Sequence, residues 1–265
     1  MEAEIGIIGG SGLYSLLENP HEAELTTKYG KPSSAVSVGE IDGRKVAFIA
    51  RHGKKHTIPP HKVPYRANIE AFAQLGVTRV VTTNAIGSFI KAYKPGDFVF
   101  MDQFINMTHS REDTFYDKDE VVHISTAHPY CDVLRKHAIE VAKKQNIAFH
   151  ETGTIVVVNG PRFSTKAESK LFSAMGAQVI NMTQYPEVAL AREKEMCYAG
   201  IGMVTDYDAG LDGVNGIVPV SHAEVARTFA NNIEKVKRLI YGLIPEVPQK
   251  RTCACREALK GARIL

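Results

Sequence analysis

The chain has 265 residues, of which 44% are hydrophobic and 23% are charged. This length suits one large α/β domain or two small ones, and the composition is ordinary for a globular protein. The net charge is +3, and the basic residues are spread along the chain. Nucleic-acid binding usually needs a basic run or stripe, so we expect an anionic small molecule as partner and no nucleic acid.

Residues 1–4 are acidic and lead directly into an apolar run. A secretory signal begins with basic residues and has a longer apolar core. No stretch approaches the roughly 18 apolar residues of a membrane span. We therefore expect a cytoplasmic protein that does not bind a membrane.

Short apolar runs rich in β-branched residues alternate with helical patterns along the chain. Near-continuous apolar strands are typical of a sheet that helices cover on both faces. Strands are expected at residues 5–8, 45–49, 79–83, 98–102, 154–158, 178–182 and 198–205. Helices are expected at residues 65–75, 132–145, 169–175 and 186–194, and in a last segment that includes residues 225–240.

The last helix has the clearest pattern, because five apolar residues repeat at helical spacing. We predict that they belong to the core and not to a cofactor site. They are Val225, Phe229, Ile233, Val236 and Ile240. The sequence thus predicts a single α/β domain at residues 1–245, with a mixed central sheet flanked by helices, followed by a tail at residues 246–265.

The chain contains four cysteines. Cys131 and Cys197 have apolar neighbours, and we interpret them as buried thiols. Cys253 and Cys255 form a C-x-C pair in the tail, either as two free thiols or as a strained, redox-labile disulfide. The sequence spacing offers no matching second pair, so a zinc site is not expected.

A glycine-rich loop, Gly9-Gly10-Ser11-Gly12, follows the first expected strand. Glycines there let backbone N–H groups approach a ligand, and Ser11 adds a hydroxyl donor, so the loop suits an oxyanion. It is neither G-x-G-x-x-G nor a Walker loop, which argues against a dinucleotide or a nucleoside triphosphate. A tight turn that binds nothing is the alternative.

A basic segment at residues 51–61 follows the strand at residues 45–49 and holds three histidines and three cations. The end of a buried strand delivers it to the ligand-binding edge of the sheet. Arg51 can fork onto two phosphate oxygens, and His52 can add another donor. A basic surface loop is the alternative. The segment lacks carboxylates and cysteines, so no metal is expected.

Two further strand ends carry polar side chains. Asn84 follows the strand at residues 79–83, and it either faces the same anion or forms a turn. Thr183 can donate to phosphate, while Met182 offers an apolar face to a sugar. Glu187 can receive a sugar hydroxyl or cap the helix that follows.

Asp206 and Asp208 flank Tyr207 after the last expected strand. In extended backbone both carboxylates lie on one side. Such a pair needs a cation, a proton or a donor-rich ligand, and adenine supplies donors at its 6-amino group. A solvated acidic turn is the alternative.

Taken in order, the motifs of this chain resemble those of the trimeric purine nucleoside phosphorylase and methylthioadenosine phosphorylase family. The similarity extends from residue 5 to the final helix. It implies a nucleoside phosphorylase-like fold with a partly barrel-like sheet, a purine nucleoside and inorganic phosphate as substrates, and no cofactor. The motifs are GIIGGSG (6–12), RHG (51–53), PPHKVPYRANI (59–69), NAIGS (84–88), GPRFSTKAES (160–169), NMT with PE (181–187) and TDYD (205–208).

The resemblance also implies roles for single residues. Met182 would contact the ribose, and a purine site would include Asp206, Tyr207 and Asp208. A trimer or hexamer is implied, in which His123 either reaches a neighbour's sugar pocket or is a local surface histidine. The implied phosphate site consists of Ser11, Arg51, His52, Asn84, Ala85 and Thr183.

Specificity is implied at both ends of the nucleoside. Phe163 and Ser164 would border the base, and His222 and Val225 would lie in the 5′ pocket. An aspartate at position 206, where members that prefer 6-oxopurines tend to carry asparagine, favours adenine. We expect methylthioadenosine as the preferred substrate, with adenosine, inosine or guanosine as a broader alternative.

Asp206 is the expected catalytic residue, because a buried carboxyl can protonate the purine N7 as the base departs. Phosphate would supply both the nucleophile and the anion beside the cationic sugar C1′. A nucleoside hydrolase and a nucleotide-sensing protein without catalysis are the competing interpretations.

Overall fold

The computed structural model describes residues 3–10, 12–118, 120–218 and 220–264. Ser11, one of the predicted phosphate ligands, therefore lies outside the described residues. The strands in the described ranges are β1 (Ile5–Gly9), β2 (His21–Ala23), β3 (Val36–Ile41), β4 (Arg44–Ala50), β5 (Arg79–Ser88), β6 (Phe98–Phe100), β7 (Gln103–Met107), β8 (Phe149–His150), β9 (Thr154–Val158), β10 (Val179–Asn181) and β11 (Cys197–Tyr207).

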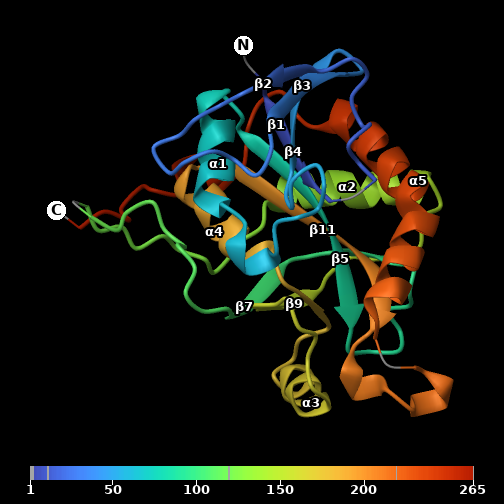
Figure 1. Cartoon of the computed structure of the whole chain (residues 1–265). Coiled ribbons are helices and arrows are strands. Elements are labelled where there is room, and N and C mark those ends of the chain that lie inside the picture. Colours follow the sequence, from blue (N-terminus) through green and yellow to red (C-terminus); the bar gives the residue numbers. More distant parts are fainter. Residues whose placement is uncertain (1–2, 11, 119, 219, 265) are drawn as a thin grey trace.

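The helices of the described ranges surround this sheet (Figure 1). They are α1 (Tyr65–Gln74), α2 (Asp132–Lys144), α3 (Lys166–Ala174), α4 (Gln184–Glu193) and α5 (His222–Glu246), with short 3-10 turns at Pro60–Lys62, Ala209–Leu211, Val214–Gly216 and Ala254–Glu257. The sequence Thr165-Lys166-Ala167-Glu168 has the pattern that predicts a capping box, and α3 begins with one. The Thr165 hydroxyl accepts from the Glu168 N–H, and the Glu168 carboxylate accepts from the Thr165 N–H.

The strands form one mixed, branched sheet in the order β2-β3-β4-β1-β5-β10-β9-β7, and β11 adds β6 and β8 from β5. β5 and β11 run parallel along the full length of β5, with a bulge between Val204 and Asp206. The prediction of a mixed sheet flanked by helices is confirmed. The pairings of the described strands do not close into a ring, so the sheet is not a barrel.

Two apolar layers cover the sheet, because the strands are buried on both faces. On one side α1 packs against α4, and on the other α2 packs against α5 (Figure 1). Phe72 of α1 and Leu190 of α4 belong to one core cluster, and Leu134 of α2 and Leu239 of α5 belong to the other. No helix in the described ranges is long and apolar enough to cross a membrane.

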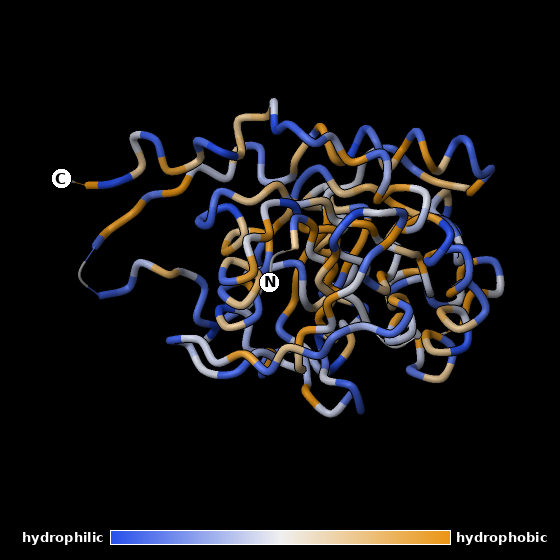
Figure 2. Tube along the Cα trace, turned by 90° about the horizontal axis from the view of Figure 1, so that it is seen from above, coloured by the Kyte–Doolittle hydropathy of each residue, from blue (hydrophilic) through white to orange (hydrophobic). Residues whose placement is uncertain are grey.

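The chain beyond α5 packs back onto the body. The guanidinium of Arg44 donates to the carbonyl of Val247 at 2.8 Å, and that of Arg79 donates to the carbonyl of Pro248 at 2.7 Å. Near the C-terminus, Arg263 forms a β-bridge with Val122. The segments around these two residues, 121–123 and 262–264, project from the body side by side (Figures 1 and 2). We call these two segments the arm.

Four cysteines converge where the tail meets the body. The sulfurs of Cys131, Cys197, Cys253 and Cys255 all lie within 4.8 Å of one another, and all four are free thiols. The expectation that the C-x-C pair has no matching partners is therefore wrong. The start of α2 and the start of β11 bring the second pair together from positions far apart in sequence.

Candidate functional site

A cavity of about 1080 Å³ lies where β4, β5, β10 and β11 end, and α5 forms one of its walls. Residues predicted from five separate motifs meet there. The predicted residues that line it are Arg51, His52, Asn84, Ala85, Phe163, Ser164, Met182, Thr183, Asp206, Asp208, His222 and Val225.

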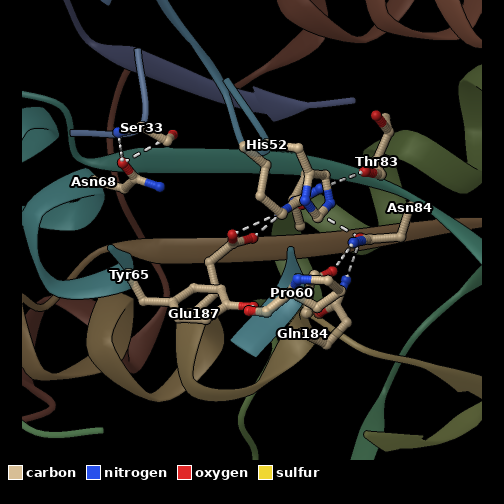
Figure 3. Close-up of polar contacts among 12 residues, drawn as sticks. Ser33, His52, Pro60, Tyr65, Asn68, Thr83, Asn84, Gln184 and Glu187 are labelled. Carbon is tan, nitrogen blue, oxygen red and sulfur yellow. Dashed lines mark hydrogen bonds and ion pairs between the residues drawn. The ribbon is translucent and has the colours of Figure 1, made fainter. Parts of the chain in front are cut away.

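Arg51 does not present its guanidinium fork to the cavity. Its Nε and Nη2 atoms each donate to one carboxylate oxygen of Glu187 at 2.9 Å (Figure 3). Tyr198 donates to the same carboxylate at 2.7 Å. Arg51 is 2% exposed and Glu187 is fully buried. The prediction that Arg51 grips two phosphate oxygens is corrected, because a buried arginine needs a buried counter-ion. Both roles predicted for Glu187 are corrected as well, because it is not among the described residues that line the cavity and α4 begins without a side-chain capping bond.

The remaining donors of Arg51 are also largely engaged. Nη1 donates to the carbonyl of Thr83 at 3.1 Å, and Nη2 donates to the hydroxyl of Thr82. A guanidinium has five N–H groups. One N–H on Nη1 is thus left without a partner among the described residues, so Arg51 can offer a ligand a single donor.

Asn84 and Thr183 form the best-defined donor pair of the cavity. β5 continues through Asn84 to Ser88, so Asn84 lies inside a strand and does not form a turn. Its Nδ2 donates to Thr183 Oγ1 at 2.8 Å, across almost one hundred residues of sequence. Both side chains are buried except toward the cavity that they line.

His52 has the opposite hydrogen-bonding character to the one predicted. Its Nδ1 lies 2.8 Å from the carbonyl oxygen of Ile58, and a carbonyl only accepts, so Nδ1 carries the proton. Burial, with a contribution from the charge of Arg51, lowers the pKa of His52 to about 4. At neutral pH the other ring nitrogen, Nε2, is therefore an acceptor. Such a nitrogen suits the hydroxyl of a hydrogenphosphate and cannot donate to its ionised oxygens.

Several cavity residues hold polar atoms that have no partner in the described chain. They include Thr83 Oγ1, Asn181 Nδ2 and Asp208 Oδ2, and each of these residues lines the cavity. A buried polar atom without a hydrogen bond costs about 1–3 kcal/mol. The walls of the cavity thus contain both donors and acceptors that the described chain leaves without partners.

Two carboxylates occupy the end of β11. Burial, with a contribution from Asp208, raises the pKa of Asp206 to about 7, and the Thr205 hydroxyl donates to it at 2.6 Å. Burial also raises the pKa of Asp208. The predicted alternation is confirmed for the two aspartates. The prediction that Tyr207 belongs to the purine site is corrected. Its hydroxyl donates to the carbonyl of Lys91, and it is not among the described residues that line the cavity.

α5 contributes more to the cavity than its apolar pattern indicates. Val236 and Ile240 are buried in the core as predicted. Phe229 and Ile233 pack against the same core and also line the cavity, whereas Val225 lines the cavity without belonging to the described core clusters, so the prediction of five core residues is corrected at Val225. The apolar stripe that packs on the sheet in the second half of the helix continues as a cavity wall in the first half.

His123 lies on the arm, where its N–H donates to the carbonyl of Ala262 at 2.8 Å. Its side chain is exposed, and it is not among the described residues that line the cavity of its own chain. Its role at a neighbour's sugar pocket stays a prediction.

Sequence reasoning missed the counter-ion of Arg51 and the cavity positions of Phe229 and Ile233. A signal existed for the first, because a buried arginine at a strand end requires a carboxylate and Glu187 follows another predicted phosphate ligand. No comparable signal existed for the two apolar residues, since core and cavity walls share the same helical period.

Comparison with known proteins places this geometry in a family. Residues 4–245 match the phosphorylase superfamily. The S-methyl-5'-thioadenosine phosphorylase of Thermofilum pendens is 55% identical over 265 residues, which cover 99% of this chain and 99% of that protein. The protein of the same name from Saccharolobus solfataricus is 49% identical, and the match covers 99% of this chain and 98% of that protein.

Solved structures agree with the sequence relatives. The methylthioadenosine phosphorylase from Schistosoma mansoni in complex with adenine has a TM-score of 0.92 at 34% identity and covers 99% of both chains. A methylthioadenosine phosphorylase from an antarctic soil metagenomic library has a TM-score of 0.92 at 37% identity, and it covers 99% of this chain and 93% of that one.

Proposed function

The chain belongs to the phosphorylase superfamily, and we propose that it cleaves methylthioadenosine with inorganic phosphate. The products are adenine and 5-methylthioribose 1-phosphate, and phosphate is a co-substrate, so no cofactor takes part. One observation carries the proposal: a single cavity holds fixed hydrogen-bond donors at Asn84 and Thr183 and two buried carboxyl groups at Asp206 and Asp208.

Phosphate binds at the donor end in this account. Asn84 and Thr183 donate to its oxygens, Arg51 adds one N–H, and His52 accepts from its hydroxyl. Ala85 adds the backbone of β5 to the same place. Ser11 is proposed as a further donor from the sequence alone.

The purine binds at the carboxyl end. A phosphate oxygen attacks C1′, the bond from C1′ to N9 breaks, and its electron pair passes into the purine ring. Asp206, whose pKa of about 7 leaves it partly protonated at neutral pH, gives its proton to N7. Asp208 accepts from the 6-amino group, and Phe163 and Ser164 border the base.

The 5′ substituent lies against α5, and Met182 contacts the ribose. Val225, Phe229 and Ile233 of α5 together give the cavity an apolar wall. An apolar wall favours a methylthio group over a hydroxyl, by roughly 1–3 kcal/mol for a group of this size. The relatives from Thermofilum pendens and Saccharolobus solfataricus, named for methylthioadenosine, support the same substrate.

A broader purine nucleoside phosphorylase is the second candidate. His222 lies in the first turn of α5 with Val225, and both line the cavity, as does His56. A histidine near the 5′ position can bond a hydroxyl, which would admit adenosine, inosine or guanosine.

We propose a homotrimer or hexamer as the active assembly. The exposed His123 on the arm supports this, because a second copy could bring it to a sugar site. Sedimentation of the purified protein tests the assembly, and a monomer with full activity would contradict it.

The function is tested by incubating the purified protein with methylthioadenosine, with and without phosphate, and measuring free adenine. We expect release only with phosphate, in the presence or absence of a metal chelator. Release that continues without phosphate would identify a hydrolase. No release under either condition would identify a binding protein. Adenosine and inosine in the same assay separate the two candidates.

A further inference from the structure

Gln184 is a fully buried amide that does not line the cavity in the described chain. It is the first residue of α4, and its side chain lies between Tyr130 and Asn84. Its Nε2 donates to Asn84 Oδ1 at 2.6 Å (Figure 3). Tyr130 Oη donates to its Oε1 at 3.2 Å. It therefore contacts Asn84, which lines the cavity, without lining the cavity itself.

The contact decides which end of the Asn84 amide faces the cavity. The amide oxygen can accept two hydrogen bonds and the nitrogen can donate two. Oδ1 receives Gln184, and it also receives Thr82 Oγ1 at 3.3 Å. With both acceptor positions of Oδ1 filled, Nδ2 is left to face Thr183.

The orientation of Asn84 in turn sets that of Thr183. Thr183 Oγ1 accepts from Asn84 Nδ2, so its own O–H remains available to donate. The hydroxyl has no competing duty, because Thr183 precedes α4 without a side-chain capping bond. One N–H of Asn84 and the O–H of Thr183 are therefore both donors for an anion in the cavity that these residues line.

Gln184 is itself held in one orientation. The buried hydroxyl of Tyr130 donates to Oε1, which leaves Nε2 as the end of the amide that faces Asn84. Gly200 provides the space: a Cβ atom there would lie 2.8 Å from Gln184 Nε2 and 2.9 Å from Oε1. β11 thus accommodates the amide by lacking a side chain at this position.

We propose that Gln184, oriented by Tyr130 and accommodated by Gly200, is a positioning residue that makes Asn84 and Thr183 donors toward phosphate. This role rests on the proposed function, because it assumes that phosphate binds at these two residues. Gln184 acts on the phosphate end alone, so it should change the KM for phosphate and leave the KM for the nucleoside unchanged.

The test compares Gln184→Met in two backgrounds, with initial rates measured at varied phosphate and saturating methylthioadenosine. Methionine keeps the volume and removes the donor. In the wild-type background we expect the KM for phosphate to rise about tenfold, the loss of one well-placed hydrogen bond. In the Asn84→Ala background we expect a further change of less than about twofold, because the residue through which Gln184 acts is absent.

Tyr130→Phe provides a milder variant that keeps the packing of the core. It removes only the hydroxyl that orients Gln184, and we expect the KM for phosphate to rise about threefold. Tyr241→Phe is the matched control, because it removes a hydroxyl that donates to the carbonyl of Leu16 at 2.8 Å, away from the residues that line the cavity. Its KM for phosphate should equal that of the wild type.

The outcomes distinguish failure of the positioning role of Gln184 from failure of the proposed phosphorolysis. A wild-type enzyme that needs no phosphate refutes the proposed function and this role with it. A phosphate-dependent wild type whose KM for phosphate is unchanged in Gln184→Met and in Tyr130→Phe refutes the role alone. Equal factors from Gln184→Met in both backgrounds also refute it, since Gln184 would then act independently of Asn84.

Discussion

The two ends of the cavity are built on opposite principles. At the end proposed for phosphate, Asn84 and Thr183 are tied into a continuous network of buried hydrogen bonds, in which Asn84 donates to Thr183. At the end proposed for the purine, Asp208 keeps an oxygen without a partner in the described chain, and Asp206 is bonded to its neighbour Thr205. One end is arranged in advance, and the other depends more on its ligand.

The difference follows from what each end must do. A phosphate oxygen accepts hydrogen bonds from any direction, so the protein must fix donors to hold it in line with C1′. The purine must receive a proton, so its end needs a carboxyl group whose pKa lies near the working pH. The buried charges also differ in their partners. The carboxylate of Glu187 offsets the guanidinium of Arg51, whereas Asp206 has no cationic partner among the causes of its raised pKa, of which burial is the largest.

The largest effect is expected at the buried ion pair between Arg51 and Glu187. Glu187→Ala leaves Arg51 without its counter-ion, and loss of one partner of a buried pair costs about 3–5 kcal/mol. We expect the free energy of unfolding, measured by denaturant titration, to fall by this amount. Glu234→Ala is the control, because Glu234 pairs with Lys237 on the surface and should cost less than about 1 kcal/mol. Equal losses in the two variants would contradict the account of this end.

The next largest effect is expected at the purine end. Asp206→Ala removes the proposed proton donor, and turnover should fall on the order of a hundredfold. The KM for phosphate should stay within about twofold, because Asn84 and Thr183 are untouched. Turnover close to that of the wild type would remove Asp206 from the mechanism.

The raised pKa of Asp206 also predicts a dependence of stability on pH. Its ordinary value is 3.8 and its folded value is about 7, so the folded state holds the proton more tightly. Stability is therefore lost as pH rises from about 4 through 7, by on the order of 4 kcal/mol in total. Asp206→Asn should remove this loss, so its melting temperature should exceed that of the wild type by much more at pH 8 than at pH 4.5. An equal difference at both pH values would contradict burial of the ionised form.

The smallest effect is expected at the 5′ pocket, away from both ends. Val225→Thr keeps the shape of the side chain and replaces a methyl group by a hydroxyl. We expect the ratio of kcat/KM for methylthioadenosine to that for adenosine to fall about threefold to tenfold. Side-by-side assays of the two nucleosides check it, and an unchanged ratio would place the 5′ group elsewhere.

Prediction from sequence succeeded where local patterns carry the information. The capping box of α3 and the alternation of Asp206 and Asp208 are local, and the structure has both. The strand at Val36–Ile41 was missed, because Gly39 and Glu40 interrupt its apolar pattern. Motifs at strand ends predicted that Arg51 and Asp206 meet, since β4, β1, β5 and β11 run parallel and deliver their ends to one edge. The strand before Thr183, β10, runs antiparallel to β5, so this rule does not explain how Thr183 reaches the site.

Prediction failed where partners are distant and their directions matter. Arg51 was expected to grip phosphate, but Glu187 occupies its fork. His52 was expected to donate, but the carbonyl of Ile58 fixes it as an acceptor. The cysteine cluster joins residues more than one hundred positions apart, which no spacing rule reveals. Sequence shows which groups are polar, and only the fold shows what each one is bonded to.

The separation of the two ends is the central claim, and one matrix of initial rates tests it. Phosphate and methylthioadenosine are varied together for Thr183→Val and for Asp208→Ala. We predict that Thr183→Val raises the KM for phosphate at least about tenfold with little change for the nucleoside, and that Asp208→Ala does the reverse. Two variants that raise the same KM would contradict the claim.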